Sequence, residues 1–219
     1  MTDATADACG ILQFMSSSRR LAPGLGAGEV AMTHAVSETR IGQLVGGLPE
    51  DFRSLLSNFA PFPEDNLLTL RREDVQRMLP DGVLVPADFV RQCRFLSVEH
   101  AFHFLKFMAT GHHLAALCFV WDSTHPVARS RDGYLVKKAG GRAGLALLSK
   151  DDQVLWAAHR QGILRALTLR KFSDAHPQFQ DVLIATGPMR LVHAVRGHAE
   201  EWDWLYGARA AAQHRCLLL

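Results

Sequence analysis

The amino-acid sequence predicts a mainly α-helical α+β fold with a minor sheet. Apolar residues recur at three- and four-residue spacing in most segments after residue 50, as they do in amphipathic helices. No region alternates between strand and helix patterns, as the βαβ units of a parallel α/β protein would. With 219 residues and 48% hydrophobic content, the chain can bury one sizeable core.

Composition divides the chain into an N-terminal extension and one domain. Residues 1–45 are rich in Ala, Gly, Ser and Thr, which is typical of a flexible or loosely packed extension. Their glycine-rich stretch at residues 24–28 does not match a dinucleotide-binding loop, because no β-rich segment precedes it. We therefore expect a single domain over residues 46–219, with residues 64–95 as an irregular insertion.

Short elements are expected before the main helix of this domain. Near-helical spacing of apolar residues predicts a helix over residues 52–59, which Pro61 ends. Within the insertion, residues 71–79 could form a short helix and residues 82–85 a short strand.

The strongest helix pattern lies between Ser97, a suitable N-cap, and Gly111, where the helix should end. Glu99, His103 and Lys106 fall in one row on a single face of this helix. A carboxylate, an imidazole and an ammonium in such a row could tune one another's pKa for proton transfer. Spacing alone favours a simpler interpretation, in which the row is the solvent-exposed face of an amphipathic helix.

Further elements follow in the second half of the domain. The apolar run at residues 114–121 is typical of a buried helix, and residues 134–139 precede a Gly-Gly pair that would end a short helix. Acidic residues at the start of segment 149–172 and an apolar stripe along it predict a long helix. Residues 179–185 predict another helix, and residues 191–195 could form a short strand.

Composition and motifs exclude several function classes. Lys and Arg exceed Asp and Glu by only 24 − 22 = 2, so the chain lacks the strong positive field of a DNA-coating protein. The basic stretch from Arg129 to Lys150 could bind phosphate locally, although a solvated basic surface is the commoner explanation. The motifs of P-loop enzymes, serine hydrolases, cysteine nucleophiles and zinc peptidases do not occur, so we expect no metal site.

The termini and cysteines favour an intracellular protein. The acidic N-terminus differs from a secretory signal, and no apolar run approaches the roughly 20 residues that span a membrane. The four scattered cysteines are interpreted as free thiols. We expect a cytoplasmic protein, or a nuclear one in a eukaryotic cell, without stable membrane insertion. Residues 216–219 match a prenylation motif, but a leucine-rich tail is the commoner explanation.

Several short motifs occur in order along the domain. They are Leu-Ser-Asn-Phe-Ala-Pro at 56–61, Ser-Val-Glu-His-Ala-Phe-His-Phe-Leu-Lys-Phe at 97–107, Gly-Arg at 141–142, Trp156, Lys-Phe at 171–172, Ala-Thr-Gly at 185–187 and Leu-Val at 191–192. Together they resemble the NADAR superfamily, whose bacterial namesakes are the YbiA proteins, over about residues 52–204. The resemblance implies a compact, mainly α-helical domain that needs no metal or cofactor and cleaves a ribose from a nitrogenous heterocycle.

The resemblance also implies roles for individual residues. Glu99 corresponds to the family's essential glutamate and would act on the attacking water or stabilise an oxocarbenium-like ribose. Lys106 would bind a phosphate or assist the leaving base. The implied substrate-binding residues are Asn58, Phe59, His103, Arg142, Trp156, Glu201 and Trp204.

Two regions depart from the family pattern. The connection between Pro63 and Ser97 is longer than usual, so the insertion is either a substrate-contacting flap or a structural addition. Leu205 follows Trp204 where the family has glycine, which leaves Trp202 as an alternative register for the late motif.

Three functions remain open. The favoured one is removal of ADP-ribose from guanine bases of nucleic acid, because the insertion and the basic stretch suit a large polyphosphate ligand. The second is hydrolysis of a ribosyl-heterocycle phosphate of riboflavin synthesis, which needs only one phosphate site. The third is a non-catalytic module that binds ADP-ribose or NAD; intact Glu99 and Lys106 argue against it, and the altered C-terminal motif argues for it.

Overall fold

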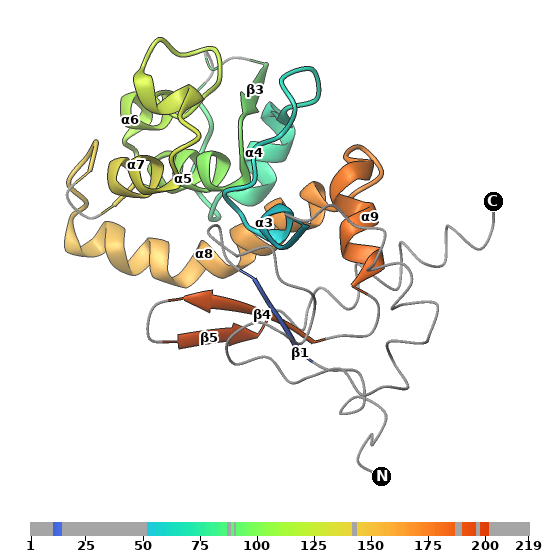
Figure 1. Cartoon of the computed structure of the whole chain (residues 1–219). Coiled ribbons are helices and arrows are strands. Elements are labelled where there is room, and N and C mark those ends of the chain that lie inside the picture. The colour runs from blue at the N-terminus through green and yellow to red at the C-terminus, as the bar shows by residue number, and fades with distance from the viewer. Residues whose placement is uncertain are drawn as a thin grey trace, which may run out of the picture. The chain divides into compact units, whose positions relative to one another are not determined.

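The structure, a computed structural model, is dominated by helices, with two small sheets (Figure 1). The described residues are 11–14, 52–86, 89, 91–141, 144–186, 190–195 and 198–201. The predicted fold class, mainly α with a minor sheet, is confirmed. The chain falls into two compact units, one of residues 58–171 and one of residues 1–57 and 172–219. The predicted domain boundary near residue 45 lies outside the described residues and stays a prediction.

The insertion forms a strand, a helix and a second strand within the unit of residues 58–171. These elements are β2 (Leu68–Arg71), α4 (Arg72–Met78) and β3 (Gln92–Phe95), and the two strands pair antiparallel. The predicted helix over residues 71–79 is confirmed. The strand predicted over residues 82–85 is wrong, because the Gln76 side chain bonds the backbone of Val83 and Val85 instead of a neighbouring strand.

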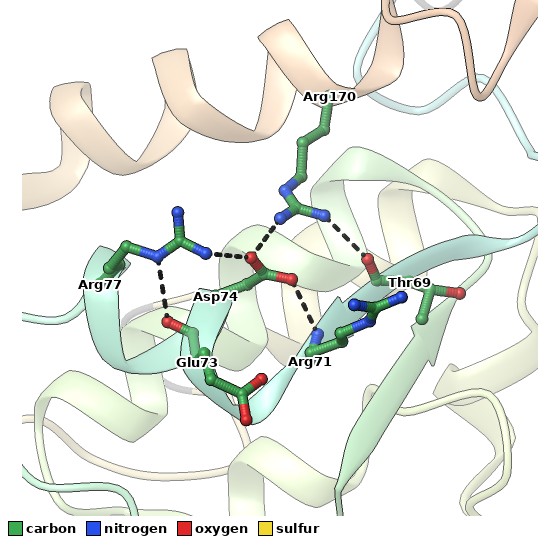
Figure 2. Close-up of polar contacts among 6 residues, drawn as sticks. All are labelled: Thr69, Arg71, Glu73, Asp74, Arg77 and Arg170. Carbon is green, nitrogen blue, oxygen red and sulfur yellow. Dashed lines mark hydrogen bonds and ion pairs between the residues drawn. The ribbon is translucent and has the colours of Figure 1, made fainter.

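Asp74 connects this insertion to the long helix α8 (Lys150–Lys171), as Figure 2 shows. Arg170 of α8 forms an ion pair with the Asp74 carboxylate and donates to the Thr69 carbonyl at 3.2 Å. Asp74 also accepts hydrogen bonds from the Arg77 guanidinium at 2.8 Å and from the Arg71 backbone N–H at 3.1 Å. The carboxylate therefore links α4 to its own N-terminus and to α8.

Helix α5 (Val98–Ala109) is the central helix of the same unit and contacts β3, α6, α7 and α8. Its predicted limits are confirmed. The Ser97 hydroxyl accepts a hydrogen bond from the His100 N–H, and Gly111 after the last turn adopts a φ of 74°, which glycine tolerates best. Of the residues in α5, only Phe102 is not buried. The helix is therefore enclosed on nearly all sides.

Shorter helices surround α5. They are α6 (His113–Leu117), the 3₁₀ helix η2 (Pro126–Arg129) and α7 (Gly133–Ala139). The helices predicted for α7 and α8 are confirmed, whereas the buried helix predicted over residues 114–121 is only partly right. Helix α6 ends at Leu117, and its Leu114 is 84% exposed.

The other unit contains two described helices and a three-stranded sheet. The helices are α3 (Phe52–Leu56) and α9 (Pro177–Ala185), and the strands are β1 (Ile11–Phe14), β4 (Arg190–Val195) and β5 (His198–Glu201). Strand β4 pairs parallel to β1 and antiparallel to β5. Helix α9 and strand β4 confirm predictions, and α3 is shorter than expected. Strand β1 was not predicted, because it lies in the Ala- and Gly-rich N-terminal range.

None of the described helices combines the length and the apolar character needed to cross a membrane.

Candidate active site

The row of Glu99, His103 and Lys106 on α5 is buried. The three residues are 9%, 6% and 5% exposed. The interpretation of this row as a solvent-exposed face is therefore wrong, because all three side chains are buried in a helix that contacts β3, α6, α7 and α8. A buried row of ionisable groups is costly to keep unless the groups are paired or functional, which makes this row the main candidate for an active site.

Glu99 and His103 lie within ion-pair distance of each other. The His103 Nε2 is 3.1 Å from the Glu99 Oε1, but the angles do not form a hydrogen bond. Both ring nitrogens of His103 lack a hydrogen-bond partner among the described residues. The carboxylate and the imidazole are thus close together, and neither forms a hydrogen bond with a described side chain.

Lys106, the third residue of the row, lies about one turn of α5 beyond His103. Its ammonium donates a hydrogen bond to the Gly140 carbonyl and lies 4.4 Å from the centre of the Phe107 ring. Burial lowers the pKa of Lys106 to about 8, against the opposing attraction of Glu99. The amine can therefore hold or release a proton close to neutral pH.

The two ends of α7 lie directly against candidate residues. A side-chain carbon on Gly140 would overlap the His103 ring, and one on Gly133 would overlap the Phe59 ring. Neither contact could be recognised in the sequence, where these glycines look like ordinary helix ends. Only glycine allows the backbone at both positions to approach the rings so closely.

Asn58 lies next to Glu99 at the start of α5. Its carbonyl accepts a hydrogen bond from the Glu99 N–H at 3.0 Å. The residue is 6% exposed, and its side-chain Oδ1 has no partner within the described part of the chain. An unsatisfied buried carbonyl oxygen is rare in proteins, so this atom is available to a hydrogen-bond donor of a ligand.

Trp156 of α8 reaches the row through a second aromatic ring. Its ring centre is 4.8 Å from that of Phe102, which in turn lies 5.8 Å from the His103 ring. The structure therefore brings together Asn58, Phe59, Glu99, His103 and Lys106. Trp156 is connected to this group through Phe102. Arg142 and Trp204 lie outside the described residues, and of Glu201 only its backbone in β5 is described.

The predicted phosphate-binding stretch is partly engaged in local contacts. The Arg129 guanidinium lies 4.9 Å from the centre of the Trp121 ring, and Arg131 lies 3.6 Å from the Glu64 carboxylate. In the segments that the structure describes, no three His, Cys, Asp or Glu side chains are grouped to share a metal ion. The expectation that the reaction needs no metal stays a prediction.

The chain matches no family model, and no match to a curated protein or a solved structure was found. The resemblance to the NADAR superfamily therefore stays a prediction.

Proposed function

We propose that this chain is a hydrolase that cleaves the N-glycosidic bond of a ribosyl compound, with Glu99 as the central carboxylate. The observation that carries the proposal is the buried row on α5, in which a carboxylate, an imidazole and an ammonium lie side by side. The order of motifs that resembles the NADAR superfamily supports the same chemistry.

Glu99 is suited to act on the attacking water. Its side chain keeps 12% of its surface exposed, so a water molecule can reach a carboxylate that is otherwise enclosed. In the proposed step, the carboxylate accepts a proton from water while the oxygen forms a bond to C1′ of the ribose. The bond from C1′ to the base nitrogen breaks, and its electron pair leaves with the base.

Lys106 and His103 would support this step. The ammonium form of Lys106 can give a proton to the departing base nitrogen or neutralise a phosphate of the substrate. The pKa of about 8 keeps most of that ammonium protonated at pH 7 while making proton donation easier than from an ordinary lysine. His103, 3.1 Å from the carboxylate, would limit the positions open to Glu99 by close contact rather than by a hydrogen bond.

Neighbouring residues can bind the substrate. The free Oδ1 of Asn58 can accept a hydrogen bond from a ribose hydroxyl or a base amine. The aromatic pair of Phe102 and Trp156 offers an apolar surface for a heterocycle.

We favour ADP-ribosylated guanine in nucleic acid as the substrate, as the sequence suggests. A phosphorylated ribosyl heterocycle of riboflavin synthesis is the second candidate. It gains support from the contacts of Arg129 and Arg131, which leave fewer free cations for a polyphosphate.

The test is to incubate the purified protein with a guanine-ADP-ribosylated oligonucleotide and, separately, with the ribosylaminopyrimidine phosphate. Chromatography follows free ADP-ribose or ribose phosphate. We expect release from the oligonucleotide. Release only from the small phosphate would replace the substrate but keep the reaction, and release from neither would reject both of these substrates for the proposed hydrolase.

A further inference from the structure

A pocket of about 370 Å³ lies between η2, the C-terminal half of α7 and residues 144–145. Its apolar lining comes mainly from Val127, Leu135, Ala139 and Leu145. The volume falls within the range of pockets that hold small organic ligands. Glu99, His103 and Lys106 do not line it, so the pocket is separate from the row on α5.

Backbone contacts fix the walls of this pocket. The His100 ring of α5 bonds the Val127 carbonyl at 3.0 Å, which attaches η2 to the central helix. The Leu145 N–H donates to the Ala139 carbonyl at 2.8 Å, and Gly144 lies so close to Ala139 that a side chain there would overlap its carbonyl. Because the walls are already held in place, a ligand would not have to order them.

The polar groups of the pocket favour an anion. Lys138 is exposed, lines the pocket, and forms no ion pair with the described residues. The Val127 N–H donates to the His125 Nδ1 at 3.2 Å, so a neutral His125 ring carries its proton on Nε2 and can donate from there. The described residues that line the pocket include no acid, and the nearby Asp132 carboxylate is occupied with capping α7.

We propose that this pocket binds a small organic anion with an apolar ring system and one carboxylate, sulfonate or phosphate group. The ring system would lie against Leu135, Ala139 and Leu145, and the anionic group would meet the Lys138 ammonium. The proposal does not rest on the hydrolase activity, because the pocket is argued from its own lining and not from Glu99, His103 or Lys106.

The test uses 8-anilinonaphthalene-1-sulfonate as the probe, with affinity measured from its fluorescence. Lys138→Glu should weaken binding about tenfold, because it replaces an attractive charge with a repulsive one. The matched control is Lys137→Glu, which makes the same charge change at an exposed neighbour that does not line the pocket. That variant should bind within about twofold of the wild type.

Two further measurements separate the contribution of the apolar ring system from that of the anionic group. N-phenyl-1-naphthylamine has the same ring system without the sulfonate, so its affinity should be insensitive to Lys138→Glu. Leu145→Trp should fill the pocket and abolish binding of both probes, with an unchanged melting temperature showing that it is folded. Equal sulfonate affinities for the wild type, Lys138→Glu and Leu145→Trp would overturn the proposal. A loss of affinity in Glu99→Gln as large as in Lys138→Glu would overturn the independence of the two sites.

Discussion

Two buried carboxylates in the same unit have opposite surroundings. Asp74 of α4 is 7% exposed and Glu99 of α5 is 9% exposed. Asp74 is bonded by the side chains of Arg77 and Arg170 and by the Arg71 N–H (Figure 2). Glu99 has no hydrogen bond to its carboxylate among the described residues, and only His103 lies within ion-pair distance.

This difference indicates that Asp74 is a structural carboxylate, whereas the Glu99 carboxylate is available to react with a substrate or with water. A buried carboxylate that stabilises a fold is surrounded by donors, because each unpaired oxygen would cost free energy. Glu99 lacks such donors among the described residues and lies beside an imidazole and an amine of lowered pKa. Such an arrangement is expected where a carboxylate must accept a proton from a substrate or from water.

The largest effect should come from Glu99→Gln. We expect turnover to fall at least about 1,000-fold, since the variant removes the base but keeps the shape. The melting temperature and the affinity for unreacted substrate should stay close to those of the wild type, because no described residue forms a hydrogen bond with this carboxylate. Steady-state assays, calorimetry and binding to a non-hydrolysable substrate analogue measure the three quantities. A strongly lowered melting temperature would instead place Glu99 with Asp74 as a structural group.

His100 should behave as a structural residue like Asp74. Its ring is bonded to the Ser97 hydroxyl at 2.8 Å and to the Val127 carbonyl, and burial lowers its pKa to about 4 from the ordinary 6.5. The unfolded chain therefore binds a proton at a higher pH than the folded one. Stability contributed by this residue is complete above pH 6.5 and is lost as the pH falls toward 4, by about 3 kcal/mol in total.

Urea unfolding between pH 4 and pH 7 checks this prediction. His100→Gln can keep hydrogen bonds to both partners but does not titrate, so its unfolding free energy should fall less steeply over that range. Equal pH dependence in the two proteins would show that His100 is not the group responsible.

Asp74→Asn is the structural counterpart of Glu99→Gln. It should lower the free energy of unfolding by about 2 kcal/mol, less than for a fully buried pair, because the Arg77 side chain is mostly exposed and the Arg170 side chain partly exposed. The rate per folded molecule should not change, since the contacts of Asp74 lie within the insertion and with α8 and do not include Glu99, His103 or Lys106. Denaturant unfolding and an activity assay at low temperature measure the two effects.

The smallest effect concerns the pH dependence of the reaction. If Lys106 acts as an ammonium, kcat should fall about tenfold per pH unit above its pKa of about 8. Unfolding through this group cannot cause the decline, because a lowered lysine pKa makes the folded state more stable as the pH rises from 8 to 10.5. Lys106→Met should show a low rate without this decline.

The helices and the row could be predicted from the sequence because they depend on local periodicity. Ser97 and Gly111 define α5 from its own residues, and spacing alone aligns Glu99, His103 and Lys106. Their burial was harder to predict. The signal was present, since Phe102, Phe104 and Phe107 place apolar rings on several faces of α5, as in a central helix.

Other features depend on contacts between distant residues and could not be predicted. Strands β2 and β3 have four residues each, and their pairing joins segments more than 20 residues apart. The loop at residues 82–85 is held by hydrogen bonds between the Gln76 side chain and the backbone of Val83 and Val85, and no local pattern predicts these bonds. The close approach of Gly140 to His103 likewise becomes visible only when α5 and α7 are packed together.

The most direct test of the difference between Glu99 and Asp74 is a single-turnover assay on three proteins. Wild type, Glu99→Gln and Asp74→Asn are each mixed in excess with a guanine-ADP-ribosylated oligonucleotide at a temperature at which all are folded. We predict release of ADP-ribose at equal rates by the wild type and Asp74→Asn, and no release by Glu99→Gln. Equal release by the wild type and Glu99→Gln would contradict the central role of this carboxylate.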